Sequence, residues 1–133
     1  MPHVLEPLPG KTLEESYMGK AYVNDKGNAE CVEFIKQTVG GPGTAGWREG
    51  TKITKGDLTV IRGTAIATFV DGKYSHLGAS NQHAAIYLDQ DAVGIWVLDQ
   101  FKRQGLVDKR NIKWLPTSPG KSNDANAFSV IEW

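Results

Sequence analysis

The sequence predicts an α+β domain in which an early helix packs on an antiparallel β-sheet. Its strongest helical pattern lies near the N-terminus, and the segments with strand character follow one another over short links. The chain has 133 residues, a usual length for one domain with one hydrophobic core. We therefore expect residues 1–133 to form a single domain.

Composition narrows the classes of protein to consider. The 15 Lys and Arg residues balance 15 Asp and Glu residues, and this zero net charge argues against a nucleic-acid-binding or polybasic membrane-surface protein. No apolar run approaches the roughly 20 residues that span a bilayer. A single cysteine excludes a disulfide framework and a multi-cysteine zinc site. Phosphate-loop and metal-binding motifs are absent from the sequence, so neither a cofactor nor a metal is predicted.

Two helices are expected before the strands begin. Residues 12–18 start with Thr12 as a helix cap and place Glu15 at the capping-box position. Residues 28–39 form the stronger candidate, with Asn28 as the cap and apolar side chains on one face. A Gly-Gly-Pro-Gly run at residues 40–43 ends this second helix.

The rest of the chain predicts a loop and then a sheet. Residues 40–58 are rich in Gly and Thr around one tryptophan and are interpreted as a loop able to carry a helical turn. Aromatic residues spaced along strands, such as Tyr74, more often belong to a core than to a groove. Five segments have strand character: residues 64–70, 83–88, 94–100, 111–115 and 127–133.

The single cysteine, Cys31, lies in the first turn of the stronger predicted helix. Unpaired N–H groups and the helix dipole favour a thiolate there and would stabilise an oxyanion formed when the sulfur attacks a carbonyl. The alternative is a buried cysteine that behaves as a small hydrophobic side chain, which is the commoner role of a lone cysteine. Position by itself leaves both open.

A nucleophilic thiol needs a base, and the chain offers three histidines. His3 lies in the proline-rich lead-in and His76 in a polar, turn-rich segment, where solvated side chains are expected. His83 opens a strand of small and apolar residues, a favourable position for a catalytic imidazole. The alternative for His83 is a hydrogen-bonded histidine that merely starts a strand.

A hairpin would supply the acid. If residues 83–88 and 94–100 pair around a turn at 89–93, Leu88 faces Gly94 and His83 faces Asp99. Opposed Cβ atoms lie about 4.5–5.5 Å apart, so the Asp99 carboxylate would hold the imidazole Nδ1–H. A shift of one residue in the register would bring Gln100 there, so Gln100 is the reserve candidate.

This order of residues resembles the NlpC/P60 and CHAP superfamily of papain-like cysteine peptidases and amidases. A cysteine at a helix start is followed by a sheet that carries a histidine and then an acid on the next strand. The resemblance spans roughly residues 28–101 and is closest to the small type VI secretion amidase effectors. Four stretches carry it: NAECVEFIKQ, GTAIATF, HAAIYL and IWVLDQF.

The resemblance implies a papain-like fold and hydrolysis of an amide in peptidoglycan. Cys31 would be the nucleophile, His83 the general base and acid, and Asp99 the orienting residue. Family members cut either the γ-D-glutamyl–diaminopimelate bond or the diaminopimelate–D-alanine cross-link, and we favour the cross-link.

The resemblance also implies a route and a partner. Such effectors are injected into the periplasm of a neighbouring bacterium, and an immunity protein that occludes the active site protects the producer. The N-terminus shows none of the features of a Sec signal peptide, which fits injection. Two alternatives stay open: another thiol hydrolase or acyltransferase of the same fold, and a non-catalytic binding module with a structural Cys31.

Overall fold

The computed structural model describes residues 2–74 and 78–133 of the chain, which form helices and one antiparallel sheet. The α-helices are α1 (Leu13–Tyr17) and α2 (Cys31–Thr38), and short 3₁₀ turns are η1 (Thr44–Gly46), η2 (Lys121–Asn123) and η3 (Ala125–Ala127). The strands are β1 (Arg48–Lys52), β2 (Ala65–Val70), β3 (Lys73–Tyr74), β4 (Ala84–Gln90), β5 (Gly94–Asp99), β6 (Asp108–Lys113) and β7 (Phe128–Glu132).

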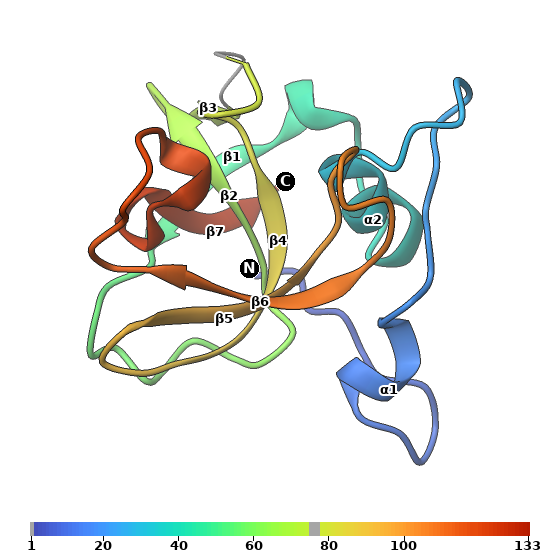
Figure 1. Ribbon diagram of the computed structural model, residues 1–133, viewed down its shortest axis with the longest axis horizontal. Coiled ribbons are helices and arrows are strands. Elements are labelled where there is room, and N and C mark those ends of the chain that lie inside the picture. The colour runs from blue at the N-terminus through green and yellow to red at the C-terminus, as the bar shows by residue number, and fades with distance from the viewer. Residues whose placement is uncertain (1, 75–77) are drawn as a thin grey trace.

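The sheet curls on itself at one end and stays open at the other. Its strand order is β3-β1-β7-β2-β4-β5-β6, and β3 pairs with both β1 and β2, so these strands and β7 close a ring. The β4–β5–β6 meander extends from the ring, and α2 packs against β4 (Figure 1). The predicted α+β class with an antiparallel sheet is confirmed.

Helix α1 has the predicted cap. The Thr12 hydroxyl accepts from the backbone N–H of Glu15 at 3.0 Å, and the Glu15 carboxylate accepts from the backbone N–H of Thr12 at 3.0 Å. These two bonds satisfy amides that a helix start leaves unpaired.

Helix α2 begins later than predicted. Asn28 was expected to be its cap, but the cap residue is Glu30 and Cys31 is the first helical residue. Asn28 belongs instead to a preceding turn, in which its backbone N–H donates to the Asn24 side chain and its carbonyl accepts from the Asn24 N–H. The correction moves Cys31 from inside the first turn to the very start of the helix.

Two hydrophobic clusters cover the two faces of the sheet. Phe34 and Ile35 of α2 are fully buried against one face, together with Ile86 of β4. Tyr87, the next residue of β4, belongs to the cluster on the opposite face, with Phe128 of β7. The alternation of β4 residues between the clusters follows the two-residue period of a strand, and the packing of α2 fixes the helix start next to the start of β4.

Two strand predictions need correction. Strand β1 falls inside the segment predicted as a loop. It was not predicted as a strand because its residues are polar, mostly exposed, and show no alternation of apolar and polar side chains. The fourth predicted strand, 111–115, is displaced to β6 (Asp108–Lys113), and Leu115 is 85% exposed. Strand β6 lies at the end of the sheet order, where one side lacks a paired strand and polar residues are tolerated.

The β4–β5 hairpin forms with a register that differs from the prediction. Ile86 pairs with Leu98, and an irregularity between Tyr87 and Asp89 adds one residue to β4. The tight turn is closed by Asp91, whose carboxylate accepts from the backbone N–H groups of Val93, in the turn, and Gly94, the first residue of β5. Continued by one residue, this register places Asp99 opposite Ala85 and therefore diagonal to His83.

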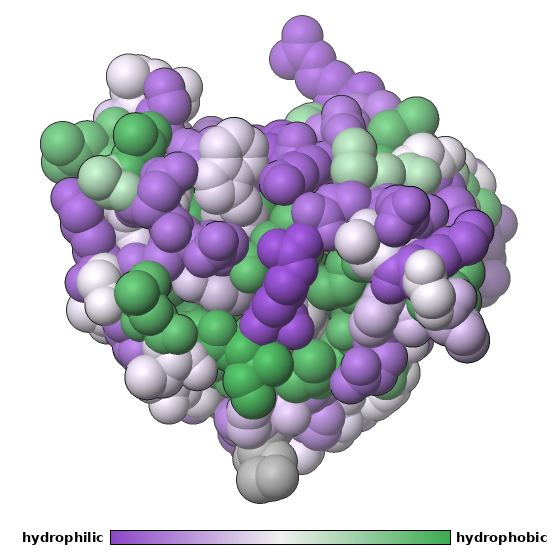
Figure 2. Space-filling model, turned by 90° about the horizontal axis from the view of Figure 1, so that it is seen from below, coloured by the Kyte–Doolittle hydropathy of each residue, from purple (hydrophilic) through white to green (hydrophobic). Residues whose placement is uncertain are grey.

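Hydrophilic and hydrophobic side chains both appear on the face of the molecule shown in Figure 2. Among the described helices, none has the length and apolar character needed to cross a bilayer.

Candidate active site

Cys31 lies at the junction of α2 with the start of β4. The residue is partly buried and packs against the hydrophobic cluster beneath α2. Burial by itself raises the pKa of the Cys31 thiol. The opposing effects together are larger and lower this pKa below its usual value: hydrogen bonds with the His83 and Tyr74 side chains and the Ala84 backbone N–H, and the charge of His83. The surroundings of Cys31 therefore favour the thiolate.

His83 sits directly before β4 and joins Cys31 to Asp99. Its Nε2 lies 2.7 Å from Oδ2 of Asp99, and both side chains are buried. The prediction assigned Nδ1 to the acid, whereas in the structure Nε2 faces Asp99, which lies diagonally across the hairpin. Nδ1 is thus left for the thiol of Cys31, with which the His83 side chain also hydrogen-bonds.

The imidazole is held from both sides by aromatic rings and by the sheet. The rings of Phe101 and Phe128 lie edge-on to it, with centroids 6.2 and 6.3 Å away. The backbone N–H of His83 donates to the Thr68 hydroxyl at 3.1 Å, and the His83 carbonyl accepts from the Thr68 N–H at 3.0 Å. A side chain fixed in this way presents one orientation to the sulfur.

The charges of this cluster support one another. Burial alone would lower the pKa of His83, but its hydrogen bonds with Asp99 and Cys31 and their charges raise it to about 9. Burial likewise opposes ionisation of Asp99, yet hydrogen bonds and charge from His83 and Arg110 lower the pKa of its carboxyl. The pKa shifts of the three groups therefore favour their charged forms: a thiolate, an imidazolium and a carboxylate.

Arg110 completes the cluster and was not found from the sequence. Its guanidinium donates to both oxygens of Asp99, from Nε at 3.1 and 2.9 Å and from Nη2 at 2.7 Å. The contact is again diagonal, because Asp99 pairs with Asp108 and Val97 with Arg110. The signal would have been an alternating strand pattern that includes Arg110 and places it beside β5. The predicted strand began at residue 111, so Arg110 was left outside it.

Gln100, the reserve candidate for the third position, has a different task. Its amide donates to the carbonyls of Tyr22 at 2.6 Å and Glu30 at 2.8 Å, and its oxygen accepts from the Tyr22 N–H at 3.0 Å. Because Glu30 caps α2, Gln100 anchors the residue that precedes Cys31. Asp99, not Gln100, is the hydrogen-bond partner of His83.

Tyr74 is the second residue that sequence reasoning missed. Its hydroxyl lies 3.7 Å from Sγ of Cys31, and the side chain is 5% exposed. The buried ring of Trp47 meets the Tyr74 ring edge-on, with centroids 5.1 Å apart. Burial raises the pKa of Tyr74 far above its usual value, and the neighbouring Cys31 raises it further. The hydroxyl therefore stays protonated and able to donate a hydrogen bond.

The remaining candidate residues lie elsewhere. His3 stacks on Trp133, with ring centroids 3.5 Å apart, and His76 lies outside the described residues. Within residues 2–74 and 78–133, no group of three or more His, Cys, Asp or Glu side chains is placed to hold a metal ion. The cluster built on Cys31, a thiol joined through a histidine to a carboxylate, is suited to nucleophilic acyl transfer.

Comparison with known proteins assigns the chain to a family. Residues 10–131 match the family model described as domesticated amidase effector 2. The "Type VI secretion amidase effector 2 protein" of Salmonella typhi is 35% identical over 114 residues, which cover 77% of this chain and 84% of that protein. "Domesticated amidase effector 2" of Ixodes scapularis is 31% identical over 104 residues, covering 76% and 70%.

A solved structure agrees with these relatives. The protein titled "Type 6 secretion amidase effector 2 (Tae2)" superposes with a TM-score of 0.76 at 32% identity, covering 92% of both chains. The family match spans most of the chain and agrees with the structural similarity. The chain therefore belongs to the domesticated amidase effector 2 family.

Proposed function

We propose that this protein is a peptidoglycan amidase in which Cys31 is the nucleophile, His83 the general base and acid, and Asp99 the orienting residue. The observation that carries the proposal is the hydrogen-bonded sequence from Cys31 through His83 to Asp99, in a chain whose relatives are named amidase effectors. Cys31 lies on the helix that packs on the sheet, His83 directly precedes β4 and Asp99 ends the adjacent β5. This arrangement supports a papain-like fold of the NlpC/P60 superfamily.

The reaction follows from the protonation states. The Cys31 thiolate attacks the carbonyl carbon of the amide, and backbone N–H groups at the start of α2 stabilise the oxyanion of the tetrahedral intermediate. The His83 imidazolium then gives its proton to the leaving amine, so the C–N bond breaks and an acyl-thioester remains on Cys31. Water, deprotonated by His83, attacks the thioester and releases the acid.

The proposed substrate is a peptidoglycan stem peptide or cross-link, and we favour the diaminopimelate–D-alanine cross-link. The relatives named type VI secretion effectors support delivery into the periplasm of a recipient bacterium. An immunity protein that covers Cys31 would protect the producing cell. No cofactor takes part in the proposed steps.

A digest of purified Gram-negative sacculi tests this function. Released muropeptides are separated by chromatography and identified by mass. Conversion of cross-linked dimers to tetrapeptide monomers is the expected result and assigns the cross-link. Loss of stem residues beyond D-glutamate would keep the enzyme class and move the bond, whereas an unchanged profile would overturn the proposal in favour of a binding module.

Asp99→Asn is expected to move the alkaline limb of the pH–rate profile to lower pH. Activity requires His83 to be protonated with Cys31 ionised, so wild-type kcat/KM should fall as pH rises through about 9. Removing the Asp99 charge removes a contribution that raises the pKa of His83, and the limb should shift down by about one to three units. The control is Asp124→Asn, which removes the carboxylate charge from the residue that caps η3. An unshifted limb would remove Asp99 from the proposed centre.

Tyr74→Phe is expected to reduce kcat roughly tenfold while KM changes little. The variant keeps the ring that packs against Trp47 but loses the hydroxyl 3.7 Å from Sγ, a hydrogen bond to a charged group worth about 1.5–3 kcal/mol. Steady-state hydrolysis of a purified cross-linked dimer measures the effect. Wild-type kcat in the variant, with unchanged thermal stability, would exclude a role for the hydroxyl.

A further inference from the structure

A cavity of about 420 Å³ opens beside His83. Its lining includes His83, Phe101 and three cationic side chains, Lys102, Arg103 and Arg110. The lining that the structure describes contains no Asp or Glu. A protein of zero net charge thus gathers positive charge next to its general acid.

Only part of this charge is neutralised. The Arg110 guanidinium donates hydrogen bonds to the Asp99 carboxylate from Nε and Nη2, so its charge is paired. Lys102 and Arg103 are exposed, and neither side chain makes a hydrogen bond or ion pair with any residue that the structure describes. Two cations are therefore available to an anionic ligand in the cavity.

The opposite wall of the cavity is fixed rather than loose. The buried Ser122 hydroxyl donates to the carbonyls of Ala79 at 2.7 Å and Gln82 at 3.2 Å, and the Ser122 N–H donates to the Ser80 carbonyl at 3.0 Å. Gly120 has a φ of 101°, and a Cβ there would lie 2.2 Å from the Ser80 oxygen, so only glycine allows this close approach.

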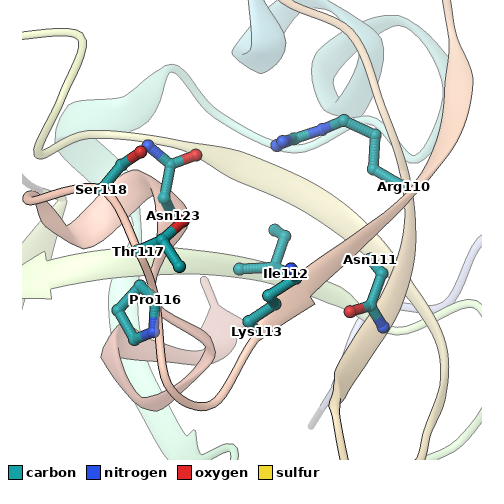
Figure 3. Close-up of a pocket in the computed structure, with 8 residues that line it drawn as sticks. All are labelled: Arg110, Asn111, Ile112, Lys113, Pro116, Thr117, Ser118 and Asn123. Carbon is teal, nitrogen blue, oxygen red and sulfur yellow. The ribbon is translucent and has the colours of Figure 1, made fainter.

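Arg110 also lines a smaller hollow. Figure 3 shows its side chain reaching from β6 toward the segment that carries Ser118 and Asn123. Asn123 and Arg110 line both this hollow, about 130 Å³, and the larger cavity beside His83. The two hollows are therefore neighbours that share Arg110 and Asn123.

The chemistry of the proposed reaction decides which part of the substrate enters. The acyl group stays on Cys31, while the amine that accepts the proton from His83 must leave on the imidazole side. A cavity beside His83 therefore receives the leaving amine and the groups attached to it. Cations at that position match a negative charge close to the amide nitrogen.

We infer that this cavity binds a carboxylate carried by the leaving-amine side of the substrate, with Arg103 and Lys102 as the charged contacts. The inference rests on the proposed function and deepens it. In the diaminopimelate–D-alanine cross-link, the carbon that bears the leaving amine also bears a free carboxylate. In the γ-D-glutamyl–diaminopimelate bond of a tetrapeptide, the corresponding carboxyl is already an amide. The cavity thus favours the cross-link.

Two cross-linked muropeptide dimers test the inference, one with a free carboxylate next to the leaving amine and one with that group converted to a carboxamide. Wild-type kcat/KM should be about tenfold or more higher for the free carboxylate. Arg103→Gln and Lys102→Gln should lower kcat/KM for the free carboxylate alone, and so reduce the preference. Lys55→Gln removes the same charge from an exposed position outside the cavity and should keep it.

Equal kcat/KM for the two dimers in the wild type would overturn the inference, as would an undiminished preference in both cavity variants. A loss that is equal for both dimers would show a structural role and overturn it too. Calorimetric binding of both dimers to Cys31→Ala needs no hydrolysis. If the wild type cleaves neither dimer, the proposed function fails. The binding measurement still tests the cavity: Cys31→Ala should bind the dimer with the free carboxylate more tightly than the carboxamide dimer. This preference should be lost in Cys31→Ala/Arg103→Gln.

Discussion

Cys31→Ala should hydrolyse peptidoglycan amides no faster than a control without enzyme. The substitution removes the only sulfur nucleophile of the chain, so no acyl-thioester forms. His83 and Asp99 remain in place, because their hydrogen bond does not depend on Cys31. The measurement is the release of monomers from cross-linked muropeptide dimers over time.

The fold should survive this substitution, which separates loss of chemistry from loss of structure. Cys31 is only partly buried, and the residues that seat α2, Phe34 and Ile35, are unchanged. A thermal denaturation curve close to that of the wild type is the expected control. Monomer release at the wild-type rate would show that another group attacks the amide and would remove Cys31 from its proposed role.

His83→Gln should lower kcat/KM at neutral pH by roughly 10²- to 10⁴-fold, the usual contribution of a positioned acid and base. Glutamine can still hydrogen-bond to Asp99 but carries no titratable proton. Without the imidazolium charge, the pKa of the Cys31 thiol should rise toward its ordinary value. Residual activity should therefore increase as the pH is raised, opposite in sign to the alkaline decline of the wild type.

His3→Gln is the matched control, because the same change is made at a histidine that stacks on Trp133. Its kcat/KM should equal that of the wild type. If His83→Gln instead kept wild-type activity and the wild-type pH profile, the general base would have to lie elsewhere.

The candidate site was accessible from the sequence because its three residues follow local rules. A cysteine at a helix start and a histidine at a strand start were visible as patterns, and the hairpin between residues 83 and 100 brought the acid near. The predicted register was wrong, because β4 continues to Gln90 and the turn is therefore shorter than the predicted 89–93 segment. The contact survived because a diagonal neighbour on the same face is still within reach of an aspartate and an imidazole.

The supporting residues could not be predicted for a physical reason. Arg110 and Tyr74 reach the site from β6 and β3, whose pairings are set by the whole sheet and not by local periodicity. Gln100 follows Asp99 directly, and successive side chains of a strand point to opposite faces. Hence Asp99 meets His83 while Gln100 bonds to Glu30 at the start of α2.

The start of α2 shows how a polar residue can mislead. Asn28 is a good cap by type, but Asn24 draws it into a separate turn. Strand β1 gives the converse case, in which Arg48–Lys52 pairs with β7 although its residues lack an apolar face. At Asn28 a competing local turn replaces the helix cap, whereas at β1 the pairing with β7 outweighs local preference.

The most direct measurement of the central claim is the rate of iodoacetamide alkylation of Cys31 as a function of pH. The chain has one cysteine, so the label reports on this thiol alone. A thiolate held by the His83 imidazolium predicts fast alkylation already below pH 7, and a shift of the profile to higher pH in His83→Gln. A wild-type thiol that reacts only as the pH approaches about 8.5, with the same profile in His83→Gln, would contradict the account.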